Sequence, residues 1–486
     1  MWSSDGTVLD AQWLFGSETE QVSADDLRLV CQIAEAKIQQ CHSNLSPNTA
    51  ASHQQPEEHM RTERQRHQWL IVLRSARNHL KRNTRKKNDR YFAALITRKS
   101  DKEELDSTMN AYYQKMEMTA TPASWQTTFG TTGLINRGNI CFMNACLQPL
   151  CAIPMLRDLF IVDDFISFLN LRRNTASRGR VSCVYSALQK ILWGGQFIQM
   201  EANLVLNELC KSINAPFEDG QQHDAQEFLS ELLNTLHEEL NQVVQKQPPQ
   251  SPSSKAISLV EGAEVEWEKA RKLDWSLIYF LFQGQMLSVQ RCGVCQTERF
   301  KFDNFTQITL EFPTKKWCTL KDCVIRHLQE EHIDWSCPEC KQLSNGTKTM
   351  YFWQLPNILI VHLKRFDFID GQFIKKDTDI TFPDGFDMQQ FVHEKSPYKP
   401  QPYTLFAITN HQGSLTRGHY TALCRNPSNG YWYHFDDSTV TILRDFHHLN
   451  SLQNSKAAYI LYYTAHNWFP AFEDSTNAMP PNAMRY

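Results

Sequence analysis

The sequence predicts an α+β fold in which helices come first and strands follow. Three segments before Gln245 carry apolar residues at helical spacing: 142–160, 181–213 and 224–245. The last is the clearest, with Phe228, Leu232, Leu236 and Leu240 four residues apart. After Trp275, short β-branched and aromatic runs bounded by turns predict strands at 308–312, 358–366, 403–408, 419–425, 431–435 and 458–463. Helices followed by strands are typical of α+β proteins.

The 486 residues exceed the usual size of a single hydrophobic core, so we expect one large domain with additional segments. Residues 1–130 are predicted to be a helical, partly basic appendage, with helix formers at 24–45 and 58–115 and a flexible joint between them. Residues 131–465 combine frequent glycines, aromatic residues and mixed helix and strand patterns, and we expect them to form one domain of catalytic size. A surface linker or insertion loop is predicted at 246–254. Residues 466–486 form a C-terminal tail.

The charge and hydropathy patterns favour an intracellular protein, in the cytoplasm, the nucleus or both. The formal net charge is only −3, and no apolar run approaches the roughly 18 to 20 residues of a membrane span. The N-terminus lacks the pattern of a signal peptide. Segment 61–103 carries 14 Lys or Arg against 4 Asp or Glu. It reads as a solvated helix face, or as a site for an import receptor or another acidic partner; nucleic acid is disfavoured as the main partner.

Cys141 is the candidate nucleophile because it stands where a glycine-containing loop enters a helix. Gly138 and Asn139 allow a tight turn, and the first backbone N–H groups of the helix favour a thiolate. The alternative is a buried cysteine packed as a small apolar residue, which is the expectation for Cys146 and Cys151.

A thiolate that attacks a carbonyl needs a base, an acid to orient the base, and a donor for the oxyanion. His419 is the predicted base, and Asp436 or its neighbour Asp437, at the end of an apolar strand, would hold the Nδ1–H of its imidazole; we assign Asp436. Asn136, five residues before Cys141, is the predicted oxyanion donor together with the Cys141 backbone N–H.

A second constellation of cysteines predicts a metal site. The pairs Cys292/Cys295 and Cys337/Cys340 have the two-residue spacing of zinc knuckles, with 41 residues between the pairs. Four thiolates would close the tetrahedral shell of Zn²⁺, so the ion would be structural. Cys318 and Cys323, which lie between the pairs, are expected to be core or loop thiols.

With these residues identified, the chain resembles the ubiquitin-specific proteases, which are papain-like cysteine deubiquitinases. Gly133 to Leu150 is similar to the Cys box of that family, and Gly418 to Ala422 with Tyr431 to Asp437 is similar to its His box. Three further segments occur in the family's order: 222–229, 355–366 and 458–463. The resemblance covers about Thr131 to Tyr463.

The resemblance implies a thumb, palm and fingers architecture, with Cys141 on the thumb, His419 and Asp436 on the palm, and the zinc knuckles at the fingertips. It implies hydrolysis of the peptide or isopeptide bond after the C-terminal glycine of ubiquitin through a thioester, with ubiquitin and ubiquitinated proteins as partners. Asp224, Glu227 and Tyr420 would bind the ubiquitin tail. From the residues alone, Asp224 and Glu227 are equally a helix N-cap and a first-turn acid.

The chain departs from the family pattern at Ile140, His223 and Arg417, none of which removes a reacting group. Pro149 would remove a hydrogen bond from the helix that presents Cys141 and tends to kink it. The departures at Ile140 and Pro149 leave open a catalytically impaired ubiquitin-binding scaffold. A protease for another ubiquitin-like modifier also stays open, because tail-binding acids alone do not distinguish all such tails.

Overall fold

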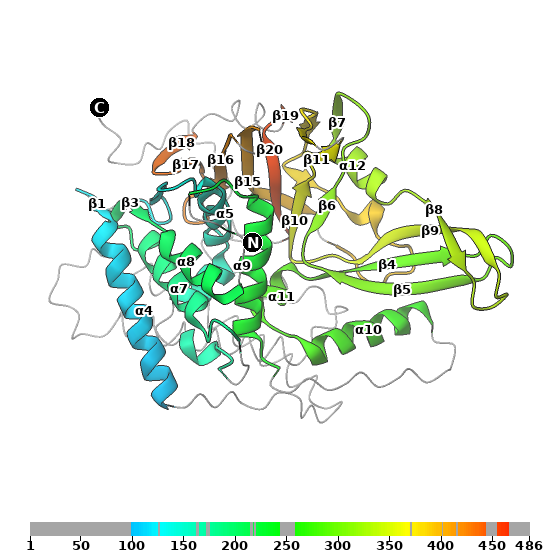
Figure 1. The fold of residues 1–486 in the computed structure, drawn as a ribbon, viewed down its shortest axis with the longest axis horizontal. Helices are drawn as coiled ribbons and strands as arrows, with labels where there is room; N and C mark the ends of the chain where they lie inside the picture. Colours follow the sequence, from blue (N-terminus) through cyan, green and yellow to red (C-terminus); the bar gives the residue numbers. More distant parts are fainter. Residues whose placement is uncertain are drawn as a thin grey trace, which may run out of the picture.

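The computed structural model describes residues 99–124, 127–161, 165–171, 175–213, 217, 220–243, 258–369, 372–400, 402–414, 417–443 and 454–465. The predicted joint, the linker at 246–254, the tail and all but the end of segment 61–103 lie outside these residues. Within them, helices dominate up to Phe282 and strands dominate afterwards, which confirms the α+β prediction. The colour order of Figure 1 follows this division, with blue-to-green helices and green-to-red strands.

The described helices are α4 (Lys99–Thr119), α5 (Cys141–Cys151), α6 (Pro154–Ile161), η3 (Phe165–Phe168), α7 (Arg180–Leu192), α8 (Asn203–Ile213), α9 (Ala225–Leu240), α10 (Leu259–Leu273), α11 (Leu277–Phe282), α12 (Leu320–His327) and η4 (Gln389–Phe391). We refer to α5, α6, α7, α8 and α9 as the thumb helices. The predicted helix at 224–245 is α9, and its four leucine and phenylalanine positions are all buried. The predicted helix at 142–160 is two helices, α5 and α6.

The prediction of continuous helix over 181–213 is wrong. The chain leaves α7 at Trp193, passes Gly195 with a φ of 68°, and forms strand β3 (Phe197–Glu201) before α8 begins. Gly194 and Gly195 explain the break, because glycine weakens a helix and accepts a positive φ without strain. Strand β3 pairs with β1 (Thr121–Pro122) and runs parallel to β2 (Gly133–Ile135), the strand that leads toward Cys141.

The palm sheet is the largest sheet and carries the C-terminal half of the predicted site. Its strands are β6 (Ile308–Leu310), β10 (Ile358–Leu363), β14 (Gly385–Phe386), β15 (Tyr403–Gly413), β16 (Gly418–Arg425), β17 (Trp432–Asp436), β18 (Thr439–Leu443) and β20 (Ala458–Thr464). Their order is β18-β17-β16-β15-β20-β10-β6, with β14 paired to β15. All six predicted strands lie in this sheet.

The fingers sheet has the order β5-β4-β9-β8, with β4 at Gly284–Arg291, β5 at Glu298–Phe305, β8 at Glu331–Ser336 and β9 at Leu343–Gln354. It extends away from the thumb helices in Figure 1, and α10 lies along it. Two small sheets complete the described strands, β19-β13-β7 (Asn454–Ser455, Asp379–Thr381, Trp317–Thr319) and β11-β12 (Phe366–Ile369, Gln372–Lys375).

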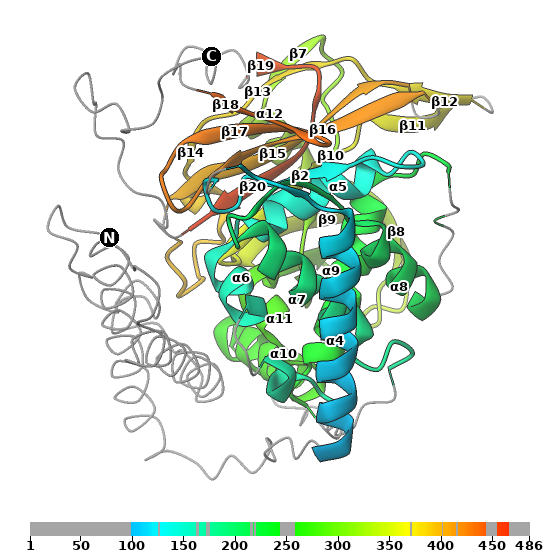
Figure 2. The same cartoon turned by 90° about the vertical axis from the view of Figure 1, so that its left-hand side faces the viewer.

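One hydrophobic core joins the thumb helices to the palm sheet. Figure 2 shows the helices gathered on one side of that sheet, and α5 packs directly against β15 and β16. A second core under the other part of the palm contains Cys318 and Cys323, both fully buried with their sulfurs 3.7 Å apart. Of the two expectations for these cysteines, core or loop thiols, the structure shows the core.

Helix α4 falls within the segment predicted to be an appendage, yet its apolar side belongs to the first core. Leu105, Met109, Tyr112 and Met116 are at most 8% exposed and lie against α7 and its neighbours. A domain boundary at residue 130 would cut through this packing. The described contacts therefore group α4 with the thumb helices.

No helix in the described part of the chain combines the length and the hydrophobicity that crossing a bilayer requires.

Candidate active site and cysteine cluster

Cys141 is the first residue of α5, as the sequence predicts. The preceding loop takes positive φ angles at Gly138 (85°) and Asn139 (63°), which turns the chain into the helix. The Ile140 N–H donates to Asn136 Oδ1 at 2.9 Å, so the loop closes on itself just before the cysteine. No side chain caps α5. The backbone N–H groups of Cys141 and Phe142, at the start of α5, act on the thiol.

The electrostatic balance at Cys141 differs from the expected one. Burial raises the pKa of the thiol, which outweighs the lowering by the backbone N–H groups of Tyr420, Phe142 and Cys141 itself; the nearby Asp437 raises the pKa further. The helix-terminus effect predicted from the sequence is present, but the burial of Cys141, which is only 3% exposed, has the larger effect on the pKa of its thiol. Activation of this thiol requires a base.

His419 and Asp436 form the predicted pair, with one correction. The His419 Nε2 atom lies 2.7 Å from Asp436 Oδ1, so the ring is held by Nε2 and not by Nδ1 as predicted. An ionised carboxylate only accepts hydrogen bonds, so Nε2 carries the proton and Nδ1 is the basic nitrogen. The two residues stand on adjacent antiparallel strands, β16 and β17.

Asp437 has a separate task, which the sequence left open. Its Oδ2 accepts from Asn136 Nδ2 and its Oδ1 accepts from Asn144 Nδ2, both at 2.9 Å. Its backbone carbonyl accepts from the Leu134 N–H at 2.8 Å. Asp437 thus ties the loop and helix around Cys141 to the end of β17. Asn144 was missed by sequence reasoning, although its position one helical turn after Cys141 places it on the same face of α5.

Asn136 therefore lies beside the nucleophile loop with its amide in a defined orientation. Its oxygen accepts from Ile140 and its nitrogen donates to Asp437. The Nδ2 group has two hydrogens, and the bond to Asp437 uses one of them. The geometry is compatible with the predicted oxyanion donor.

Two of the three predicted tail-binding residues, Asp224 and Glu227, lie at the start of α9, and the third, Tyr420, lies on β16. Asp224 is the N-cap of α9, accepting from Gln226 N–H at 2.7 Å, and it also accepts from the Tyr459 hydroxyl at 2.6 Å. Glu227 is exposed in the first turn of α9. Tyr420 is only 5% exposed and packs on the His411 ring, with the ring centroids 4.5 Å apart. The helix-cap alternative for Asp224 is thus present in the structure.

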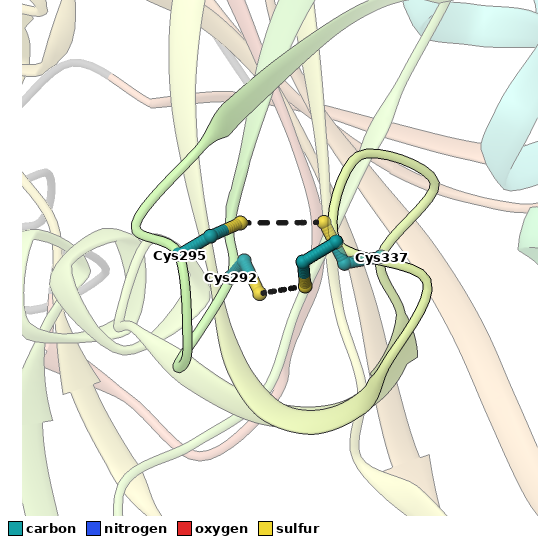
Figure 3. A group of neighbouring side chains, drawn as sticks. Cys292, Cys295 and Cys337 are labelled. Atoms are coloured by element: carbon teal, nitrogen blue, oxygen red, sulfur yellow. Dashed lines mark hydrogen bonds between the residues drawn. The ribbon is translucent and has the colours of Figure 1, made fainter.

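The four cysteines of the predicted metal site come together at the far end of the fingers sheet. Their sulfur atoms all lie within 4.8 Å of one another, with Cys292 and Cys340 at 3.8 Å and Cys295 and Cys337 at 3.6 Å. Figure 3 shows these facing sulfurs. A tetrahedron with metal–sulfur bonds of about 2.3 Å has edges of about 3.8 Å, so the cluster fits such an ion. None of the four forms a disulfide.

Both knuckles have the same local structure. Gln296 and Lys341, the residues after the second cysteines, have a φ of 58° and donate their N–H groups back to the carbonyls of Cys292 and Cys337. The long interval between the pairs contains β5, α12 and β8, and antiparallel pairing of β8 and β9 returns the second knuckle to the first. The 41-residue spacing is therefore the length of the intervening palm and finger elements.

Residues 132–463 match the family model described as ubiquitin carboxyl-terminal hydrolase. The chain is similar to ubiquitin carboxyl-terminal hydrolase 4 of Eremothecium gossypii, with 30% identity over 367 residues that cover 68% of this chain and 42% of the relative. It is also similar to ubiquitin carboxyl-terminal hydrolase 2 of Rattus norvegicus, with 30% identity over 344 residues that cover 69% of this chain and 54% of the relative. The chain thus spans about half or less of the length of these relatives.

The fold is similar to a chain in the solved structure of the SAGA Ubp8/Sgf11/Sus1/Sgf73 DUB module bound to ubiquitin aldehyde. The TM-score is 0.54, the sequence identity is 24%, and 74% of each chain is covered. This likeness supports the thumb, palm and fingers architecture.

Proposed function

Because the chain belongs to the ubiquitin carboxyl-terminal hydrolase family, we propose that it is a deubiquitinating cysteine protease that cleaves the peptide or isopeptide bond after the last glycine of ubiquitin. The observation that carries the proposal is the His419–Asp436 pair on β16 and β17, two adjacent strands that pack against the Cys141 helix. A base held by Nε2 presents Nδ1 as the proton acceptor for a buried thiol.

In the proposed mechanism, Nδ1 of His419 takes the proton of Cys141, and the sulfur attacks the carbonyl carbon of the ubiquitin glycine. Asp436 stabilises the imidazolium through Nε2, and the second Asn136 hydrogen with the Cys141 N–H stabilises the oxyanion. The imidazolium then gives its proton to the leaving amine, and a thioester remains. Water, deprotonated by His419, hydrolyses the thioester and frees the ubiquitin carboxylate and the thiol.

The substrate would enter between α9 and the palm sheet. Asp224 and Glu227 would bind the basic residues of the ubiquitin tail, and Asp224 keeps acceptor capacity after its two present hydrogen bonds. Tyr420 would contribute mainly through its backbone, since its side chain is buried. Ubiquitin and ubiquitinated proteins are the proposed partners.

We assign the cysteine cluster to a structural Zn²⁺. Four thiolates would hold the ion with no open position, and it would supply cross-linking of the two fingertip knuckles rather than chemistry. The support is the sulfur geometry and the matched knuckles.

An intracellular location, and an acidic partner or import receptor for segment 61–103, remain part of the proposal. Most of that segment lies outside the described residues. For the domains, the packing of α4 supports a catalytic unit that includes α4.

A ubiquitin probe with a C-terminal electrophile tests the activity. We expect a covalent adduct with the intact protein, its loss in Cys141→Ala, and turnover of a ubiquitin–fluorophore conjugate. Binding without turnover would favour the scaffold alternative, and faster turnover of another ubiquitin-like conjugate would favour the other modifier. An adduct that persists in Cys141→Ala would sink the assignment.

A further inference from the structure

A short loop before α9, residues Gly220 to His223, touches both halves of the catalytic site. On the palm side, the Gln222 side chain makes two hydrogen bonds with the backbone of a single residue. The Gly418 N–H donates to Gln222 Oε1 at 2.8 Å, and Gln222 Nε2 donates to the Gly418 carbonyl at 2.7 Å. Gly418 is the residue immediately before His419 and the first residue of β16.

This backbone position has little freedom. A Cβ on Gly418 would lie 2.1 Å from the Nε2 atom of His411 and 2.7 Å from the Ser414 carbonyl oxygen, so the chain crosses closely over the His411 ring. His411 is itself only 1% exposed. The backbone beside His419 is thus in contact with a buried ring and held by a primary amide. Pairing of β16 with β17 begins only at Ala422, so the sheet supports this end of the strand from β15 alone.

The same loop also holds the nucleophile. The Asn139 side chain donates to the Gly220 carbonyl at 2.8 Å, and the Phe142 and His223 rings meet edge to face with centroids 5.4 Å apart. Asn139 and Phe142 flank Cys141 closely on either side. The loop therefore connects the chain on both sides of Cys141 with the residue that precedes His419.

We propose that Gln222 is a positioning residue that sets the His419 imidazole relative to Cys141 through its two-point hydrogen bond to Gly418. It acts through the backbone and does not touch the reacting atoms. The inference rests on the proposed deubiquitinase function. A displacement of about 1 Å between catalytic groups is sufficient to lower a rate by about 100-fold, so loss of the two bonds should act on kcat.

Two substitutions in the full chain separate positioning from a general loss of structure. Gln222→Met keeps the length of the side chain and removes both hydrogen bonds, so we expect kcat for a ubiquitin–fluorophore conjugate to fall about 10- to 100-fold with KM nearly unchanged. Gln329→Met, at an exposed glutamine after α12, is the matched control and should keep both parameters. The unfolding temperatures of the wild type, Gln222→Met and Gln329→Met should agree.

Gln222→Glu supplies a signature that a structural role would not give. A protonated carboxyl both accepts from and donates to Gly418, whereas an ionised one only accepts. Relative to the wild type at the same pH, activity of this variant should recover as the pH falls from about 8 to about 5, and that of Gln222→Met should not. His223, His411, Arg417, His419 and Asp436 lie in the wild type and in both Gln222 variants. Gln222→Met adds no titrating group, so it is the reference for the pH profile of Gln222→Glu.

Hydrogen exchange at the Gly418 amide tests the two hydrogen bonds between Gln222 and Gly418 in the absence of ubiquitin. We expect exchange to be about tenfold faster in Gln222→Met than in the wild type, because the amide loses its acceptor. The inference would be overturned if Gln222→Met changed neither kcat nor hydrogen exchange at the Gly418 amide. It would also be overturned if Gln222→Met and Gln222→Glu lost the same fraction of activity at every pH. A wild type that exchanges slowly at Gly418 yet never hydrolyses the conjugate would instead count against the proposed function.

Discussion

The Thr409 hydroxyl donates a hydrogen bond of 2.9 Å to the carbonyl oxygen of Ala145, and this bond explains how α5 accommodates a proline. In an α-helix the Ala145 carbonyl would accept from the N–H of residue 149, but Pro149 has none. Thr409, fully buried on β15, supplies the missing donor. The helix continues to Cys151, and the group freed by Pro149 links the Cys141 helix to the palm sheet.

This relationship predicts coupling between the two positions. Thr409→Val should lower the free energy of unfolding by about 1–3 kcal/mol, because it leaves a buried carbonyl without a donor. In a Pro149→Ala background, where the new N–H can satisfy Ala145, the same change should cost clearly less. Chemical denaturation of the two single variants and the double variant measures the coupling. Strict additivity would show that the proline and the hydroxyl are unrelated.

Local sequence patterns predict more of the fold than of the arrangement of the site. The four-residue spacing of α9 and the short runs of the palm sheet are properties of the segments themselves, so the sequence reveals them. Strand β3 was missed because it has only five residues between two helices and depends on pairing with β1 and β2. The turn glycines that end α7 were the available signal.

At the site, the sequence predicts candidate reacting residues but not how they meet. Which nitrogen of His419 faces Asp436 depends on how two neighbouring strands pair. The division of partners between Asp436 and Asp437 depends on Asn136 and Asn144, which lie hundreds of positions away in the sequence. Burial of Cys141 is likewise a tertiary property, and it reversed the expected direction of the pKa shift. The cysteine pairs were easier, because the spacing within each knuckle already sets half of the ligand geometry.

Helix α4 should behave as part of the catalytic domain. Met116 is 1% exposed within the core, whereas Met118, two residues later on the same helix, is 85% exposed. Met116→Ala should lower the free energy of unfolding by about 2–5 kcal/mol, and Met118→Ala should change it by less than about 0.5 kcal/mol. Denaturation followed by fluorescence compares them. Equal changes in the free energy of unfolding for Met116→Ala and Met118→Ala would show that α4 does not contribute to the core of the domain, as expected for the predicted appendage.

Removing one fingertip ligand should release the proposed zinc. Cys337→Ser is expected to reduce bound zinc from about one ion per chain to a small fraction and to lower the unfolding temperature, because three thiolates hold the ion poorly. Cys318→Ala, in the buried pair outside the cluster, should keep the full metal content. Elemental analysis of both purified proteins decides the matter: zinc retained in Cys337→Ser would refute the four-cysteine site.

The substrate-free thiol should be slow to react at neutral pH. Burial and the Asp437 charge raise the pKa of Cys141, so the protonated thiol persists to higher pH than in an ordinary cysteine. Alkylation of Cys141 by a neutral reagent, followed by peptide mass, should rise only in the alkaline range. Replacing Asp437 by Asn removes the negative charge that raises the pKa of Cys141, so the increase in alkylation rate should occur at lower pH. An increase at higher pH would contradict the assignment.

Asn substitution of each acid should separate their two roles. Asp436 is 48% exposed in its side chain and contacts His419, so Asp436→Asn should reduce kcat by about 100-fold or more with little change in unfolding free energy. Asp437 is 14% exposed and accepts from both Asn136 and Asn144. Its asparagine variant offers a single acceptor oxygen to two amide donors.

Asp437→Asn should therefore lower the free energy of unfolding by about 1–3 kcal/mol, because one buried donor loses its acceptor. It should also lower kcat, because Asn136, the proposed oxyanion donor, is no longer held in place. Asn136→Ala should reduce kcat by about 100- to 1000-fold, and adding Asp437→Asn to it should have little further effect on kcat, since both act through one group. Multiplicative losses in the double variant would show that Asp437 acts on catalysis by another route.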